Sequence, residues 1–169
     1  MPAPSAHDAE FTEYVSAKAS WLRQVAFLLC GDWHRADEVL QIAITRLYVN
    51  WPRVRAAGNA DGYARTVLVN VYLAERRSPW TRRVVPLNGQ EEPPVTDGDL
   101  DSALDLRRAL ARLPARQRAI LVLRYYCDLS VEETARTLRC SQGNVKSQTA
   151  RGIDRLRRML DTPAEEVWS

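Results

Sequence analysis

The residues best suited to chemistry lie on one face of a helix predicted near the C-terminus. At about 100° per residue, the segment after Ser141 gathers on one side the polar residues Asn144, Ser147, Arg151, Asp154, Arg155 and Arg158. The opposite side carries Val145, Thr149, Gly152, Ile153, Leu156 and Leu160. Arginine can read guanine with two hydrogen bonds, and serine, asparagine and lysine can contact phosphates or base edges. The pattern favours DNA binding, with an ordinary three-helix bundle that has a solvated basic face as the alternative.

The segment just before this helix predicts how the helix is positioned. Ser130 followed three residues later by Glu133 is a capping box, so the sequence predicts a short helix over residues 131–138. After a tight turn, Ser141 can cap the longer helix. A short helix, a tight turn and a longer helix with a polar outer face are typical of a helix-turn-helix.

Helical spacing also dominates the rest of the chain, and no stretch shows the sustained alternation of a strand. The first predicted helix has an apolar face of Phe11, Val15, Leu22, Ala26 and Leu29. The second, capped by Asp32, has an apolar face of Ala36, Val39, Leu40, Ala43, Leu47 and Trp51. Pro52 is expected to end it and a loop to follow, before a third helix from about Asp61 to Arg77.

The predicted fold is all-α, with two small helical domains joined by a flexible acidic linker. Residues 79–103 form the predicted linker, because prolines and acidic residues replace the periodic apolar ones there. The domains on either side are expected over residues 8–78 and 104–161. Both are small for an independent hydrophobic core, and the sequence leaves their relative orientation open.

Charge and composition narrow the class of protein further. The net charge is +3, but residues 105–160 alone hold 13 basic and 5 acidic side chains, and such a segment attracts a polyanion. The 3 cysteines form no CxxC pair, which argues against a structural zinc site. No apolar run is long enough to cross a bilayer, and no secretion signal is evident, so the expected location is the cytoplasm.

Two stretches of the chain resemble the extracytoplasmic-function group of RNA polymerase sigma factors. Residues 113–160 are similar to region 4 of that family, through motifs such as LPARQR, LVLRYY, LSVEETA and GNVKSQTAR. The last of these is most like the actinobacterial SigE-like branch. Residues 36–41 (ADEVLQ), 63–70 (YARTVLVN) and 75–77 (ERR) resemble motifs of region 2.

The resemblance implies a sigma factor that binds core RNA polymerase and directs it to promoters. Its partners would be the beta-prime clamp helices and beta flap of the polymerase, promoter DNA, and an anti-sigma factor as a further candidate. The catalytic metal would belong to the polymerase, so the resemblance implies no enzyme activity, no cofactor and no metal site in this chain. The short apolar runs noted above imply no membrane insertion.

The resemblance also assigns roles to individual residues. It implies minus-35 contacts by Asn144, Lys146, Ser147, Ala150, Arg151 and Arg155. Among these, Arg151 is the expected base reader, and Lys146 suits a phosphate. It implies minus-10 contacts by Arg65, Asn70, Arg76 and Arg77, together with the loop over residues 55–62. Binding of core polymerase maps to Asp37, Glu38 and Gln41.

Two other functions compete with this interpretation. The first is a stand-alone transcriptional regulator that uses the same helix-turn-helix without polymerase, against which the ADEVLQ helix argues. The second is an enzyme such as a thiol hydrolase or a nuclease. The sequence lacks the Cys/His pair, carboxylate cluster or metal motif that such an enzyme needs.

Overall fold

The computed structural model describes residues 2–77 and 100–161, and for residues 100–102 the backbone alone. Within these ranges the secondary structure is helical and contains no strand. The predicted all-α class is therefore confirmed. The predicted linker, residues 79–103, lies largely outside the described residues, and its last residues already belong to a helix that begins at Leu100.

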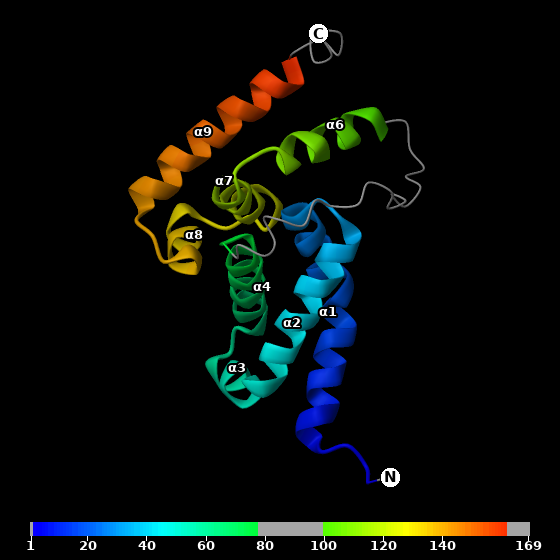
Figure 1. The fold of residues 1–169 in the computed structure, drawn as a ribbon. Helices are drawn as coiled ribbons and strands as arrows, with labels where there is room; N and C mark the ends of the chain where they lie inside the picture. The colour runs from blue at the N-terminus through cyan, green and yellow to red at the C-terminus, as the bar shows by residue number, and fades with distance from the viewer. Residues whose placement is uncertain (1, 78–99, 162–169) are drawn as a thin grey trace.

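The first lobe consists of four helices that pack around one hydrophobic interior (Figure 1). They are α1 (Ala6–Cys30), α2 (Trp33–Val49), α3 (Trp51–Ala57) and α4 (Ala60–Arg77). The predicted cap is confirmed, because the Asp32 carboxylate accepts a hydrogen bond of 3.0 Å from the His34 N–H. The apolar face predicted for the second helix is buried throughout, from Ala36 to Trp51.

The prediction of a loop directly after Pro52 is wrong. Pro52 lies in the first turn of α3, where a missing N–H costs nothing and a fixed φ favours the helix. The side chain of Val54 is fully buried and secures this short helix in the core. The helix ends before Gly58, whose φ of 73° is the left-handed conformation that glycine adopts readily. The chain between α2 and α4 is thus mostly helical.

In the second lobe the predicted helix-turn-helix packs on α7 and the turn that follows it, which together form a short helical platform. Its elements are α6 (Leu100–Ala111), α7 (Ala115–Leu121), a π-helical turn η1 (Val122–Tyr126), α8 (Val131–Leu138) and α9 (Gln142–Asp161). The π-helical turn carries a hydrogen bond of 3.0 Å from the Cys127 N–H to the Val122 carbonyl. No feature of the sequence predicted this widened turn, which shifts the register between α7 and α8.

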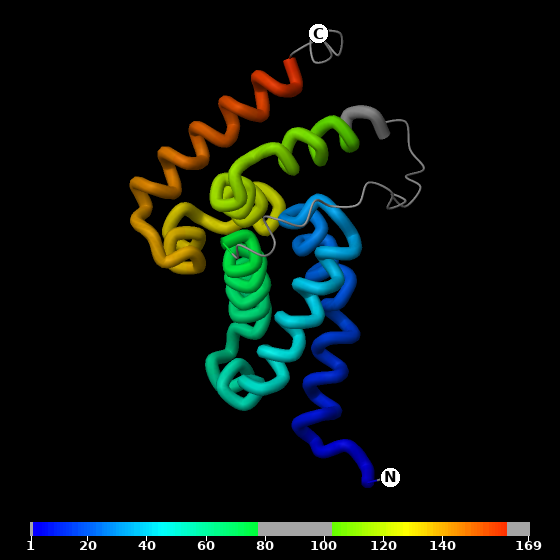
Figure 2. Tube along the Cα trace, in the orientation of Figure 1, coloured from blue at the N-terminus to red at the C-terminus, as the bar shows by residue number. Residues whose placement is uncertain are grey.

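The two lobes lie against each other and share one hydrophobic core. Residues of the second lobe such as Ile120 and Leu123 belong to the same buried cluster as Leu29 and Leu68 of the first. The trace in Figure 2 shows α7 across the ends of α1 and α4, and these helices contact one another. The structure thus supplies the orientation that the sequence left open.

Gly152 lets α9 approach this platform closely. A Cβ atom at Gly152 would lie 3.0 Å from Cδ1 of Leu121, closer than carbon atoms normally approach. Gly152 is buried, as expected from its place on the apolar side of the helix. The absence of a side chain at this position therefore sets the distance between α9 and the end of α7.

We expect Gly152→Val to lower the free energy of unfolding by about 1–3 kcal/mol, because the added atoms overpack the contact with Leu121. Chemical denaturation followed by circular dichroism measures the change. Gly143→Ala is the matched control, because a Cβ there meets only the Ser141 Oγ atom at 3.9 Å. Equal stabilities of the two variants would contradict the close approach.

Candidate nucleic-acid interface

The helix-turn-helix is fixed by two hydroxyl caps and a left-handed turn. Ser130 Oγ accepts a hydrogen bond of 3.0 Å from the Glu133 N–H, as the capping box predicts. Ser141 Oγ accepts one of 3.0 Å from the Asn144 N–H. Between these helices, Arg139 has a φ of 54° and reverses the chain. These local contacts determine the angle at which α9 leaves α8.

Every residue assigned to the minus-35 contacts lies on the exposed surface of α9. These residues are Asn144, Lys146, Ser147, Ala150, Arg151 and Arg155. On the opposite side Val145 is fully buried and Gly152 touches the platform. The apolar side of α9 therefore packs against the rest of the second lobe, and its basic side is exposed to solvent. Insertion of a helix into a major groove requires such an exposed side.

A buried glutamine behind α9 links two residues of that helix. Gln117, only 6% exposed, donates a hydrogen bond of 2.9 Å to Gln148 Oε1. Its own Oε1 accepts a longer one of 3.4 Å from Arg155 Nη1. Sequence reasoning missed Gln117, because its location between α7 and α9 depends on tertiary packing. It restrains the side chain of Arg155 at the edge of the basic face.

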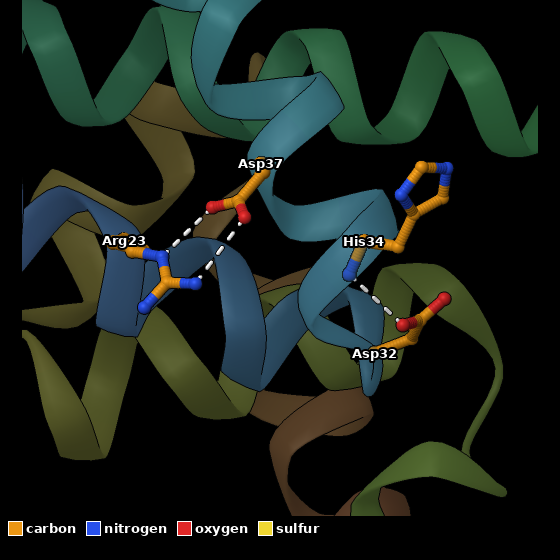
Figure 3. Close-up of polar contacts among 4 residues, drawn as sticks. All are labelled: Arg23, Asp32, His34 and Asp37. Carbon is orange, nitrogen blue, oxygen red and sulfur yellow. Dashed lines mark hydrogen bonds and ion pairs between the residues drawn. The ribbon is translucent and has the colours of Figure 1, made fainter. Parts of the chain in front are cut away.

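The outer face of α2 presents the three residues assigned to polymerase binding. Asp37, Glu38 and Gln41 are all exposed. Figure 3 shows Asp37 paired with Arg23 of α1, with contacts of 2.8 Å from Nε and 3.2 Å from Nη2. Because the carboxylate accepts these two hydrogen bonds, the pKa of Asp37 is lowered. Oε1 of Glu38 lies 3.0 Å from Nε2 of His34.

An aromatic stack supports the arginine that holds Asp37. The Arg23 guanidinium lies 4.3 Å from the centre of the Trp33 ring. Trp33 in turn stacks on Phe27, with ring centres 4.0 Å apart and an angle of 13° between the planes. Trp33 thus fixes the start of α2 against α1 and places the cation beside the proposed polymerase-binding face.

The residues assigned to the minus-10 contacts occupy two faces of α4 rather than one. At about 100° per residue, Arg65 and Arg76 lie on one side, and Asn70 and Arg77 on another. Asn70 and Arg77 are exposed, whereas Arg65 and Arg76 are half-buried. The structure therefore does not gather these four residues on one surface; Arg65 lies in a cleft that is also lined by residues of α8.

The start of α4 is anchored to α1. The Tyr14 hydroxyl donates a hydrogen bond of 2.8 Å to Asp61, and Lys18 pairs with the same carboxylate at 3.2 Å. Burial, together with the bond to Asp61, raises the pKa of Tyr14. Asn59, which sequence reasoning missed, caps α4 by accepting a hydrogen bond of 3.1 Å from the Gly62 N–H. These contacts hold the loop before α4 in a defined position.

A cleft of about 400 Å³ lies between this region and the second lobe. One wall is formed by the loop and start of α4, with Asn59, Tyr63 and Arg65. The other wall is formed by α8, with Glu133 and Arg136. In this arrangement α8 lies across the cleft from Arg65, one of the residues assigned to the minus-10 contacts.

Two features are absent from the described ranges. Among those residues, no group of three or more histidine, cysteine or carboxylate side chains could hold a metal ion. Likewise, no helix in the part of the chain that the structure describes is both long and apolar enough to span a membrane.

Comparison with known proteins identifies both lobes. Residues 14–82 match the Sigma-70 region 2 family, and residues 103–156 match the Sigma-70, region 4 family. The RNA polymerase sigma-E factor of Streptomyces coelicolor is 36% identical over 158 residues, which cover 89% of this chain and 86% of that protein. The chain belongs to the sigma-70 family of RNA polymerase sigma factors.

Further similarities locate this sigma factor within the extracytoplasmic-function group. The ECF RNA polymerase sigma factor SigM of Mycobacterium tuberculosis is 31% identical, over 82% of this chain and 71% of that protein. A solved structure of the sigma factor RpoE with the anti-sigma factor NepR, from Bartonella quintana, has a TM-score of 0.76. That similarity covers 90% of this chain and 98% of the other at 24% identity, and it shows a shared fold.

Substitution of Arg23 tests how this sigma factor holds Asp37. We expect Arg23→Ala to raise the pKa of Asp37 toward its ordinary value of 3.8, because two hydrogen bonds to the carboxylate are lost. The lowered pKa means that this contact stabilises the fold above the unfolded pKa, and that the stabilisation fades as the pH falls through the folded pKa.

Titration of the Asp37 carboxyl carbon by NMR measures this change. Arg46→Ala serves as the control, because Arg46 is an exposed arginine more than two turns further along α2. An unchanged Asp37 titration in Arg23→Ala would rule out the pairing.

Proposed function

We propose that this sigma factor binds core RNA polymerase through the outer face of α2 and reads the upstream promoter element through the outer face of α9. The chain itself performs no catalysis in this account and acts in the cytoplasm, where it joins the polymerase. The observation that carries the proposal is that the polar faces of α2 and α9 are both exposed, while the opposite side of each helix is apolar and buried.

The basic face of α9 supports a role in minus-35 recognition. Arg151 lies at the centre of this face and is exposed. Its guanidinium can donate two parallel hydrogen bonds to a guanine in the major groove. Lys146 and Ser147 lie one turn before it, where contacts with phosphate or a base edge would fix the register of the helix.

The acidic face of α2 supports a role in polymerase binding. Within the chain Asp37 already pairs with the cation Arg23, and Glu38 contacts His34. A basic partner surface would compete for these carboxylates, and Gln41 lies one turn further along the same side. Ile42, next to Gln41, is also exposed and would add an apolar contact to this face.

The start of α4 supports contact with the melted minus-10 strand. Arg65 and Tyr63 combine a cation with an aromatic ring, and these are the groups that bind single-stranded DNA by charge and stacking. The relative from Bartonella quintana was solved with an anti-sigma factor. That complex supports an anti-sigma factor as a further partner of this chain.

Affinity for core polymerase tests this proposal and the assignment of Gln41 together. We expect the purified chain to capture Streptomyces coelicolor core polymerase, and Gln41→Ala to weaken the complex while the circular dichroism spectrum is unchanged. Gln24→Ala, at an exposed position of α1, is the matched control. No complex at micromolar protein would favour the stand-alone regulator, and equal affinity of Gln41→Ala would remove Gln41 from the interface.

Arg151 provides the matching test on the DNA side. We expect Arg151→Ala to cost about 1–3 kcal/mol of promoter discrimination, because a two-bond contact with one base is lost. Competition between promoter fragments altered at single minus-35 positions measures this loss. Arg108→Ala removes the same charge from an exposed position of α6 and should leave the base preference intact. An unchanged preference in Arg151→Ala would exclude a base-reading role.

A further inference from the structure

A chain of hydrogen bonds within the second lobe ends at the edge of the basic face of α9. Nη1 of Arg155 donates to Oε1 of Gln117 at 3.4 Å, and Nε2 of Gln117 donates to Oε1 of Gln148 at 2.9 Å. Gln117 belongs to α7 and is 6% exposed, whereas Gln148 is half-buried and Arg155 is exposed. One buried amide of α7 therefore holds the ends of two side chains of α9.

The arginine sets the direction of this chain of hydrogen bonds. A guanidinium has donors only, so Gln117 must turn its oxygen toward Arg155. The NH₂ group of Gln117 then faces Gln148, which must accept with its own oxygen. The NH₂ group of Gln148 has no partner in the described part of the chain and is not buried, so it faces solvent as a donor.

Gln148 and Arg155 therefore offer donors at one edge of α9. They are seven residues apart, which places them within about 20° of each other around the helix and about 10 Å apart along its axis. Their ends approach each other because both contact Gln117. Phosphate oxygens accept hydrogen bonds and fit such an edge, whereas a base edge that presents a donor, such as N4 of cytosine, does not.

The other charges of the polar face are arranged differently. Within the described ranges Arg151 has neither a hydrogen bond nor an ion pair, so its guanidinium is free to turn toward a base. Asp154 pairs with Arg158 at 2.8 Å. At about 100° per residue, Asp154 lies about 120° around the helix from Gln148, so its carboxylate does not face the same edge.

We propose that Gln148 and Arg155 bind the phosphate backbone beside the minus-35 element, and that buried Gln117 is the positioning residue that presents both side chains as donors. Gln148 is not among the residues that the family resemblance assigns to DNA. The proposal rests on the proposed function, because it adds a contact to the DNA-binding face of α9. The phosphate contact fixes the register of the helix at its edge, while Arg151 reads a base from the centre.

Promoter affinity of Gln148→Ala tests the contact. The probe is a DNA duplex selected from a randomised library by holoenzyme that contains the unsubstituted chain and Streptomyces coelicolor core polymerase. We expect Gln148→Ala to weaken binding about threefold to tenfold, with the same preference at every minus-35 base, because phosphate carries no sequence information. Gln24→Ala, at an exposed position of α1, is the matched control. A changed base preference, or an affinity equal to that of the control, would overturn the proposal.

Uncharged methylphosphonates at single positions of the same duplex locate the phosphate. At one position or two adjacent ones, the replacement should weaken binding of the unsubstituted protein and leave the affinity of Gln148→Ala as it was. Equal losses for both proteins at every position would show that Gln148 does not contact the backbone.

Salt dependence tests the part that Arg155 plays. Neutralisation of a phosphate releases counterions, so Arg155→Ala should make the slope of log affinity against log salt concentration less steep by about one. Gln148→Ala removes no charge and should leave this slope unchanged. A slope that is the same in Arg155→Ala and in the unsubstituted protein would remove Arg155 from the phosphate contact.

Gln117→Met tests the positioning role, because methionine has a similar volume but neither donates to Gln148 nor accepts from Arg155 as the amide does. We expect it to weaken promoter binding about twofold to fivefold, with an unchanged circular dichroism spectrum. In a chain that already carries Gln148→Ala and Arg155→Ala, the same substitution should have no further effect. An equal loss in both backgrounds would show a purely structural role and overturn the positioning by Gln117.

Two negative results have different meanings. Failure of the holoenzyme with the unsubstituted chain to select any duplex would count against the proposed function. A selected duplex that Gln148→Ala, Arg155→Ala and the unsubstituted protein bind equally well would overturn the phosphate contact and leave the proposed function in place. If Gln117→Met fails to fold, the methylphosphonate experiment still decides whether Gln148 contacts the backbone.

Discussion

The contact between Leu121 and Gly152 determines how the chain can present its basic helix. Because no side chain fits between them, α9 lies directly on the end of α7. Val145 packs on the same side of α9 about two turns earlier, where it is fully buried. With one side held this closely, the polar side must face water. The surface proposed to contact DNA therefore depends on an apolar contact on the opposite side of α9.

In the first lobe, too, burial of one side of a helix leaves the opposite side exposed, and here the exposed side is acidic. Its helix α2 buries a continuous apolar face, so Asp37, Glu38 and Gln41 lie outside. Arg23 neutralises part of that surface within the chain, and His34 contacts Glu38. The first lobe thus exposes an acidic helix face on α2, and the second exposes a basic one on α9. Arg118 connects the two lobes through its hydrogen bond to the Leu29 carbonyl.

Local signals in the sequence were sufficient to predict the helix faces and caps. The Ser130 and Asp32 caps form as predicted, because each depends on residues only two or three positions away. Tertiary features were beyond such reasoning. Gln117 and Arg118 acquire their partners only when α7 meets α9 and α1, and the helical turn after Pro52 is held by burial of Val54. The domain boundaries and the site residues stay predictions.

The central claim is that this chain gives core polymerase its choice of promoter. Transcription of a library of promoter sequences by core polymerase, with and without the protein, tests it most directly. The account predicts that addition of the chain produces transcripts from a subset of templates that share an upstream and a downstream element at a fixed spacing. A set of transcripts unchanged by the protein would contradict the account.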